Sequence, residues 1–137
     1  MDIPTLSSED KKSWAIFQAL EDDDLYSILG AEPLYKPVST PEALLMEVTF
    51  LKTKQTVLLG KQRFQQIKET VREKICNKWK SLKEQVSTFN QEMVVALVLE
   101  SVRSFCGASH FPCEAAAELI CRACHYSLDK FCENLLN

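Results

Sequence analysis

The sequence predicts an all-α fold, a compact bundle of about five helices that includes one long amphipathic basic helix. Glycine and proline are few, at three and five among 137 residues. Apolar residues recur at steps of three and four, which is the helical period, and strand-like alternation is scarce. With 46% hydrophobic and 26% charged residues, a chain of this length is expected to form a single domain over residues 1–137.

The N-terminal region is expected to contain two short helices. A serine cap at Ser7 or Ser8, followed by acidic residues, starts the first helix. The acidic run at residues 21–24 interrupts the apolar pattern, lacks the spacing of a calcium loop, and is interpreted as the cap of a second helix ending near Gly30. Three prolines then hold residues 30–41 in an extended linker before the main bundle.

The next helix starts at Thr40 and Pro41, which supply a capping hydroxyl and a proline at the first helical position. We expect it to run to about Leu59. Its buried face is expected to contain four apolar residues: Leu44, Val48, Leu51 and Leu58. Gly60 either ends this helix or lies inside a longer one, where it costs about 1 kcal/mol relative to alanine.

A basic amphipathic helix is predicted over residues 61–89, about 28 residues or near 40 Å at 1.5 Å per residue. Its apolar stripe contains Phe64, Ile67, Val71, Ile75, Trp79, Leu82, Val86 and Phe89. Residues 48–89 hold ten bases and three acids, whereas residues 1–47 hold ten acids and three bases. The bases either pair internally, above all with the acidic run, or form a face for an acidic partner. The predicted partner-binding residues are Lys61, Arg63, Lys68, Arg72, Lys78 and Lys83.

Residues 93–137 contain the predicted core hairpin. Met93 to Cys106 is apolar nearly all round, which is typical of a helix surrounded by neighbours. After a turn at residues 107–111, Pro112 starts one last helix that continues to the end of the chain, with His125 on its surface. Its apolar face is expected to contain Cys113, Ala117, Ile120, Cys124, Leu128, Phe131 and Leu135.

The cysteines allow two interpretations. The N-terminus does not resemble a signal peptide, and no segment approaches the roughly 20 apolar residues that span a bilayer. The sequence thus predicts a cytoplasmic protein without a membrane span, in which the six cysteines are structural thiols. The alternative is a small zinc-binding regulatory domain, because zinc takes four thiolate or imidazole ligands. Its candidate ligands are Cys106, His110, Cys113, Cys121, Cys124 and His125.

No motif predicts catalysis. Only His110 and His125 are available as a base for a nucleophile, and neither lies in a nucleophile-elbow signature. The aromatic residues of the basic helix lie on its apolar stripe, and the net charge is −3, so a nucleic-acid partner is not expected. We expect no enzyme, no cofactor and no small-molecule ligand, but a protein–protein interaction or assembly module.

One family resemblance adds to this reading. An apolar helix ending in Phe105 and Cys106 is followed by a short turn and a Leu/Cys-rich helix. The residues Phe111, Glu114, Ala116 and Ala117 lead from the turn into that second helix. Residues 25–30 (LYSILG) also look like an N-terminal helix that ends in leucine and glycine. With these features, residues 93–132 resemble the CLAMP family of the ciliary and flagellar central apparatus.

The resemblance implies a non-enzymatic structural component of the axoneme, with a cytoskeletal partner and a location in the cilium or flagellum. A helical adaptor of Bcl-2-like or death-domain type also fits the length of the chain. No motif in the sequence is specific to either type of adaptor.

Overall fold

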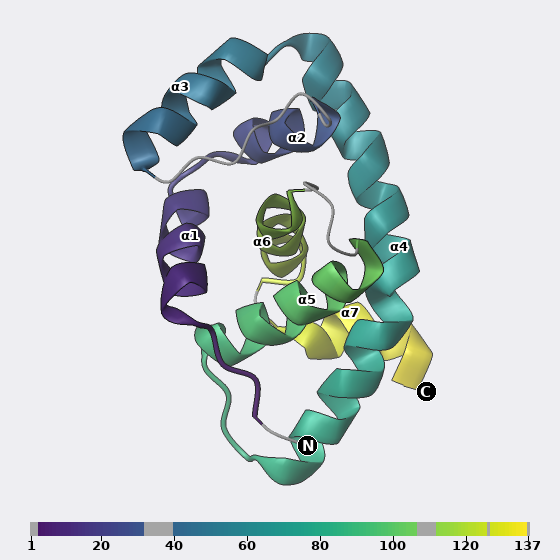
Figure 1. Ribbon diagram of the computed structural model, residues 1–137. Helices are drawn as coiled ribbons and strands as arrows, with labels where there is room; N and C mark the ends of the chain where they lie inside the picture. Colours follow the sequence, from purple (N-terminus) through teal and green to yellow (C-terminus); the bar gives the residue numbers. More distant parts are fainter. Residues whose placement is uncertain (1–2, 32–39, 107–111, 126, 137) are drawn as a thin grey trace.

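The computed structural model describes residues 3–31, 40–106, 112–125 and 127–136. All regular structure in this part of the chain is helical, which confirms the all-α fold class. The described residues form seven helices rather than about five (Figure 1). They are α1 (Ser8–Gln18), α2 (Asp22–Gly30), α3 (Pro41–Leu51), α4 (Lys54–Gln85), α5 (Gln91–Cys106), α6 (Cys113–Ala123) and α7 (Leu128–Leu136). Most of the predicted linker and the turn at residues 107–111 lie outside the described residues.

A break after Leu51 separates α3 from α4, so the single helix predicted from Pro41 to Leu59 is wrong. Lys52 adopts an extended conformation, and Thr53 caps α4 by accepting a hydrogen bond from the Thr56 N–H. α4 then continues through Gly60 and ends at Gln85, four residues before the predicted end at Phe89. A hydroxyl cap in the middle of an apolar pattern thus interrupts the helix.

The predicted C-terminal helix is also two helices. α6 ends at Ala123, His125 takes a positive φ of 52°, and α7 begins at Leu128. A left-handed residue just after a helix is a common way to end it. Cys124 and Leu128 remain buried on both sides of the break, which explains why the apolar period alone does not reveal it.

α6 is the central helix of the fold and packs against α1, α2, α4 and α5 (Figure 1). Its residues are almost all buried, and the apolar face predicted for this region is buried at every described side chain. Ile120 is fully buried and His125 is exposed, as predicted. The side chain of Leu135 lies outside the described ones. The hairpin of α5 and α6 therefore forms the core on which α1, α2 and α4 pack, whereas α3 packs against α2 and α7 against α4.

Two glycines allow α2 and α4 to cross with their backbones in contact. A Cβ atom on Gly60 would lie 1.8 Å from the Tyr26 carbonyl oxygen, and one on Gly30 would lie 1.8 Å from the Thr56 carbonyl oxygen. Both distances are far inside van der Waals contact, so no side chain fits at either position. Of the two predicted alternatives, Gly60 lies inside a longer helix rather than ending one. The close crossing with α2 explains why a glycine occupies this position.

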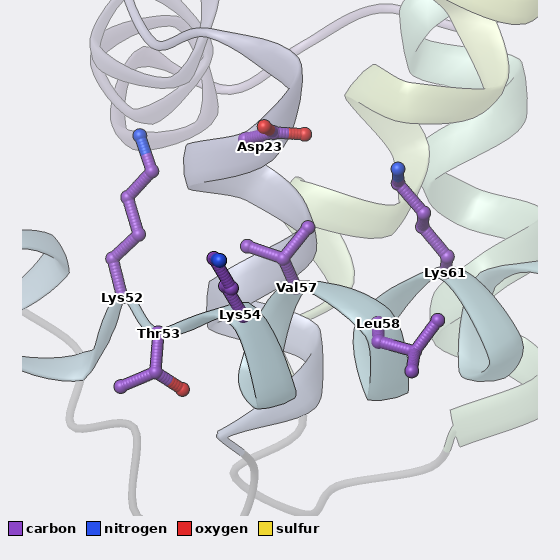
Figure 2. Close-up of a pocket in the computed structure, with 7 residues that line it drawn as sticks. All are labelled: Asp23, Lys52, Thr53, Lys54, Val57, Leu58 and Lys61. Atoms are coloured by element: carbon purple, nitrogen blue, oxygen red, sulfur yellow. The ribbon is translucent and has the colours of Figure 1, made fainter.

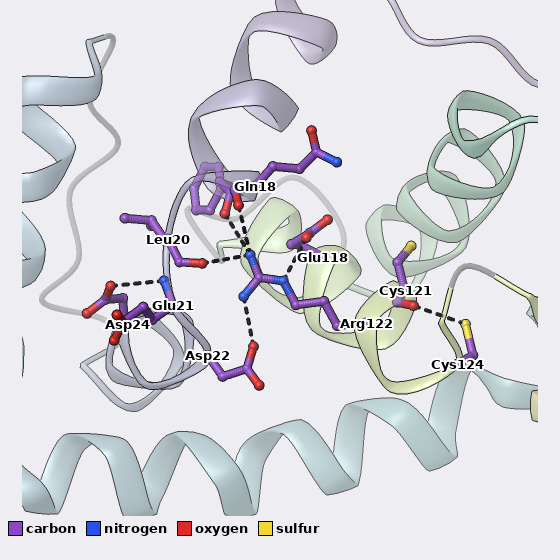
Figure 3. A network of polar contacts seen from close by, with 10 residues as sticks. Gln18, Leu20, Glu21, Asp22, Asp24, Glu118, Cys121, Arg122 and Cys124 are labelled. Atoms are coloured by element: carbon purple, nitrogen blue, oxygen red, sulfur yellow. Dashed lines mark hydrogen bonds and ion pairs between the residues drawn. The ribbon is translucent and has the colours of Figure 1, made fainter.

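Arg122 of α6 joins the core to the turn between α1 and α2 (Figure 3). Its guanidinium donates hydrogen bonds to three backbone carbonyl oxygens between Phe17 and Leu20, at 2.7–3.2 Å. Phe17 and Gln18 are the last residues of α1, where a helix leaves acceptors without intrahelical partners, and Leu20 lies in the turn that follows. Arg122 also forms 2.8 Å ion pairs with Asp22 and with the buried Glu118. One side chain therefore fixes how α1 and α2 sit on α6.

α7 is bound covalently to the C-terminal half of α4. Cys76 and Cys132 form a disulfide, with Cα atoms 5.5 Å apart, so the expectation that all six cysteines are thiols is wrong. The two residues are 56 positions apart in the sequence. They meet only because α7 folds back onto α4, and this packing has no local sequence signal.

Candidate interaction surface

The six basic residues predicted for partner binding all have intramolecular contacts. The N-terminal three contact ring faces or a carbonyl: Lys61 lies over the Tyr26 ring, Lys68 lies over the Phe64 ring, and Arg63 donates to the Leu29 carbonyl oxygen. Lys78 forms a 2.9 Å ion pair with Glu100 of α5. These contacts favour internal pairing, rather than partner binding, as the role of these basic residues.

The remaining two bases belong to the α4–α7 seam, which consists of Arg72, Trp79, Lys83, Asp129 and Phe131. Arg72 donates to the Phe131 carbonyl oxygen at 2.8 Å, and its guanidinium lies 4.5 Å from the centroid of the Phe131 ring. Trp79 Nε1 and Lys83 Nζ both donate to Asp129 Oδ1, at 2.9 and 2.6 Å. The donors Lys83 and Trp79 hold the pKa of Asp129 below its usual value. The seam thus uses basic side chains to attach α7.

In the described part of the chain, two acids of the run at residues 21–24 form ion pairs with bases outside the six predicted contact residues. Asp22 pairs with Arg122, and Asp24 pairs with Lys52 at 2.8 Å. Asp24 also accepts a hydrogen bond from the Glu21 N–H in a capping box that starts α2. The run is therefore a helix cap, as predicted. Its partner Arg122 is on α6, and its partner Lys52 lies in the break between α3 and α4.

The candidate zinc ligands are only partly described. Cys113, Cys121 and Cys124 are buried, and His125 is exposed, whereas the side chain of Cys106 and all of His110 lie outside the described residues. Within residues 3–31, 40–106, 112–125 and 127–136, no three metal-binding side chains gather. Burial, with Cys124 and Glu118 nearby, raises the pKa of the Cys121 thiol well above its ordinary value. A metal ligand or a nucleophile requires the opposite shift, toward the thiolate.

α3 buries only one of its two apolar faces. Leu44 and Val48 are 2% and 1% exposed and belong to the core. On the other side, Leu45, Met46 and Phe50 are 57%, 75% and 83% exposed. α3 packs against α2, and Figure 1 shows it at the outer edge of the bundle. A helix that is apolar on all sides is typically surrounded by protein, so this half-covered helix presents an unusual surface.

A groove of about 610 Å³ lies where α3 leads into α4 (Figure 2). It is lined by Asp23, Lys52, Thr53, Lys54, Val57, Leu58 and Lys61. Leu58 is 59% exposed, so its predicted place on the buried face is wrong, because the break after Leu51 changes the helical register. We define the α3–α4 corner as Leu45, Met46, Phe50, Lys52, Lys54, Val57, Leu58 and Lys61.

The exposed residues of α3 were not predicted from the sequence, although a signal exists. The segment PEALLMEVTFL has large apolar residues on several sides of the helix, and a domain of this size normally buries one face of a surface helix. The predicted buried face contains Leu44, Val48, Leu51 and Leu58 and leaves the other apolar residues of α3 without a role. On the same helical wheel Met46 lies opposite Leu44, and Leu45 and Phe50 lie on either side of Met46.

No protein-family model, no curated protein sequence and no solved structure matches this chain. The resemblance of residues 93–132 to the CLAMP family therefore stays a prediction, as do the adaptor types and the cytoplasmic or ciliary location. Ala116 and Ala117, which contribute to that resemblance, are buried in the core. In the described part of the chain, every helix is too short or too polar to cross a bilayer.

Proposed function

We propose that this protein is a non-catalytic helical module for protein–protein interaction and assembly, and that it contacts its partner through the α3–α4 corner. The exposed face of α3, with Leu45, Met46 and Phe50, is the observation that carries the proposal. Removing one large apolar side chain from water contributes about 1.5–3 kcal/mol. A cluster of such side chains on a folded surface is typical of an interaction site.

The basic side chains elsewhere on α4 support this choice of surface. Arg72, Lys78 and Lys83 have partners within the fold, and a partner protein would first have to displace those contacts. Lys61 belongs both to the predicted basic face and to the α3–α4 corner. Of the six predicted basic contact residues, Lys61 is therefore the one that belongs to the proposed contact surface.

The chemistry of the described side chains also favours binding over catalysis. The raised pKa of Cys121 keeps this thiol protonated at neutral pH, which is unfavourable for nucleophilic attack. His125 is exposed at the end of α6, whereas general-base catalysis requires a histidine held within hydrogen-bond reach of its substrate.

Site-specific photo-crosslinking tests the proposal. The photoreactive residue p-benzoylphenylalanine replaces Phe50 in one variant and Asn77, an exposed residue on the far part of α4, in a control variant. We expect a discrete cross-linked protein from cells at position 50 and none at position 77. The product should disappear when Leu45 and Met46 are changed to serine. Equal labelling at both positions, or none at position 50, would contradict the proposed surface.

The same capture tests the axonemal role that the CLAMP resemblance implies. Extracts of ciliated and of non-ciliated cells are compared with the Phe50 variant. A cross-linked protein found only in ciliated cells supports a place in the axoneme. The same product from both cell types contradicts the axonemal role and leaves the general interaction module.

A further inference from the structure

The groove in the α3–α4 corner combines an apolar surface with a basic rim. In Figure 2, Lys52 and Lys61 lie on either side of Val57, and Asp23 faces them from α2. Leu58 continues the apolar surface on α4 and is 59% exposed. The groove is therefore suited to a ligand that is apolar along its middle and charged along its edges.

The charges of the rim are predominantly positive. Three lysines line the groove against one aspartate. Lys52 is already paired with Asp24, but neither Lys54 nor Lys61 forms an ion pair with a described residue. Lys61 contacts only the face of the Tyr26 ring, at 5.7 Å, within the described part of the chain. Two ammonium groups are thus available to carboxylates of a partner.

We infer that the α3–α4 corner binds an amphipathic helical segment of a partner protein, with acidic residues flanking its apolar stripe. This inference rests on the proposed function and adds the chemistry of the partner. Helices dock in grooves through apolar residues at positions i, i+3, i+4 and i+7. In this site the apolar stripe covers Val57 and Leu58, and the flanking carboxylates reach Lys54 and Lys61, which also line the groove.

Shape and charge disfavour two other occupants. A bilayer surface is flat and does not fill a concave groove of about 610 Å³. A second copy of the chain, bound about a two-fold axis, presents the same surface to itself, which brings the lysines of one copy toward those of the other. An acidic helix meets neither difficulty.

The test uses two synthetic fluorescent peptides of about 18 residues, or five helical turns. Both have leucine at i, i+3, i+4 and i+7, and they differ only in carrying glutamate or lysine on the flanks. Binding is measured by fluorescence anisotropy with the full chain. The reversal variant is Lys54→Glu with Lys61→Glu. The matched control is Lys12→Glu with Lys80→Glu, which changes the same charge at two exposed lysines without ion pairs to described residues. Circular dichroism checks that each variant folds.

We expect the acidic peptide to bind the wild type and the control variant equally, and to bind the reversal variant at least about tenfold more weakly. The lysine peptide should show the opposite preference. Salt should weaken the acidic complex, because exposed charges are screened. Equal binding of both peptides to the wild type, or equal weakening by the control variant, would overturn the inference.

Two further measurements separate the competing occupants. Sedimentation with vesicles of phosphatidylserine and phosphatidylcholine measures membrane binding, and analytical ultracentrifugation measures self-association. Both are repeated with the Phe50→Ser variant. Vesicle binding or self-association that requires Phe50, without binding of the acidic peptide, overturns the inference in favour of a membrane or a second copy. Cross-linking to a protein at position 50 without peptide binding refutes the acidic helix but not the proposed function. Absence of that cross-link refutes the proposed function itself.

Discussion

The two ends of α4 are covered in different ways. At the C-terminal end, the α4–α7 seam pairs its charges and is closed by the Cys76–Cys132 disulfide. At the N-terminal end, the α3–α4 corner leaves Phe50 exposed and Lys54 without an ion pair to a described residue. The basic residues of α4 thus have different surroundings at the two ends of the helix. At the C-terminal end those of the seam have charged or aromatic partners within the fold, and at the N-terminal end those of the corner border an exposed surface.

Loss of the disulfide is the largest expected effect. In the chain-entropy account, a bridge between positions 56 residues apart stabilises the fold by about 4 kcal/mol. Changing Cys76 and Cys132 together to serine should lower the free energy of unfolding by about that amount, measured in urea. The variant should still cross-link at Phe50, because the corner lies at the other end of α4.

Reduction provides the control for the serine variant. The reductant dithiothreitol should destabilise the wild type by a similar amount and leave the variant unchanged. Alkylation followed by mass spectrometry should label Cys76 and Cys132 only after reduction. Labelling of either residue in unreduced protein would show that the seam is held by non-covalent contacts alone. Alkylation in intact cells also tests the predicted cytoplasmic location, where bridges are rare.

Two neighbouring leucines on α3 give the sharpest comparison of covered and open surface. Leu44 is 2% exposed and Leu45 is 57% exposed. Leu44→Ala should cost about 3 kcal/mol, because it leaves a cavity in the core. Leu45→Ala should change the free energy of unfolding by less than about 0.5 kcal/mol and should weaken partner capture instead. Similar costs for the two substitutions would show that the outer face of α3 is covered within the monomer.

A substitution at the α2–α4 crossing should have the next largest effect. Alanine is favoured over glycine inside a helix by about 1 kcal/mol, so Gly60→Ala would stabilise an isolated α4. In the fold, the new Cβ meets the Tyr26 carbonyl oxygen, and forcing the helices apart should give a net loss of about 1–3 kcal/mol. Gln62→Ala, at an exposed position on the same helix, is the control and should be nearly neutral. A stabilised Gly60→Ala protein would show that the helices do not cross in contact.

The sequence permits good predictions of burial and poorer predictions of connectivity. Helical spacing correctly identifies the buried stripe from Phe64 to Leu82 and the buried face that includes Ile120. It does not reveal the break at Thr53. A cap stabilises a helix start by only about 1 kcal/mol, so the residues alone do not show whether the chain caps a new helix here or continues the old one. The disulfide and the pairing of Lys83 with Asp129 depend on contacts between distant segments. The exposed side of α3 was visible in its composition, but only the fold shows that nothing in the described residues covers it.

The smallest expected effect concerns one charge in the α4–α7 seam. Hydrogen bonds from Lys83 and Trp79 lower the pKa of Asp129 in the folded state. A carboxyl whose pKa is lower in the folded than in the unfolded state stabilises the fold above its unfolded pKa of about 3.9, and this contribution is lost as the pH falls through the folded value. Asp129→Asn should therefore cost up to about 1 kcal/mol at neutral pH, as for other exposed ion pairs.

The difference in stability between the wild type and Asp129→Asn should shrink as the pH falls below about 4 and should vanish at lower pH. Urea unfolding at a series of pH values measures it. Glu84→Gln, an exposed acid on α4 without an ion pair to a described residue, is the control and should show no such trend. A difference that stays constant with pH would mean that the carboxylate charge contributes nothing to the seam. The attachment of α7 would then depend on the disulfide and on the Arg72–Phe131 contact. The paired charges of the seam would contribute no more to stability than the lysines at the other end of α4 that have no ion pair to a described residue.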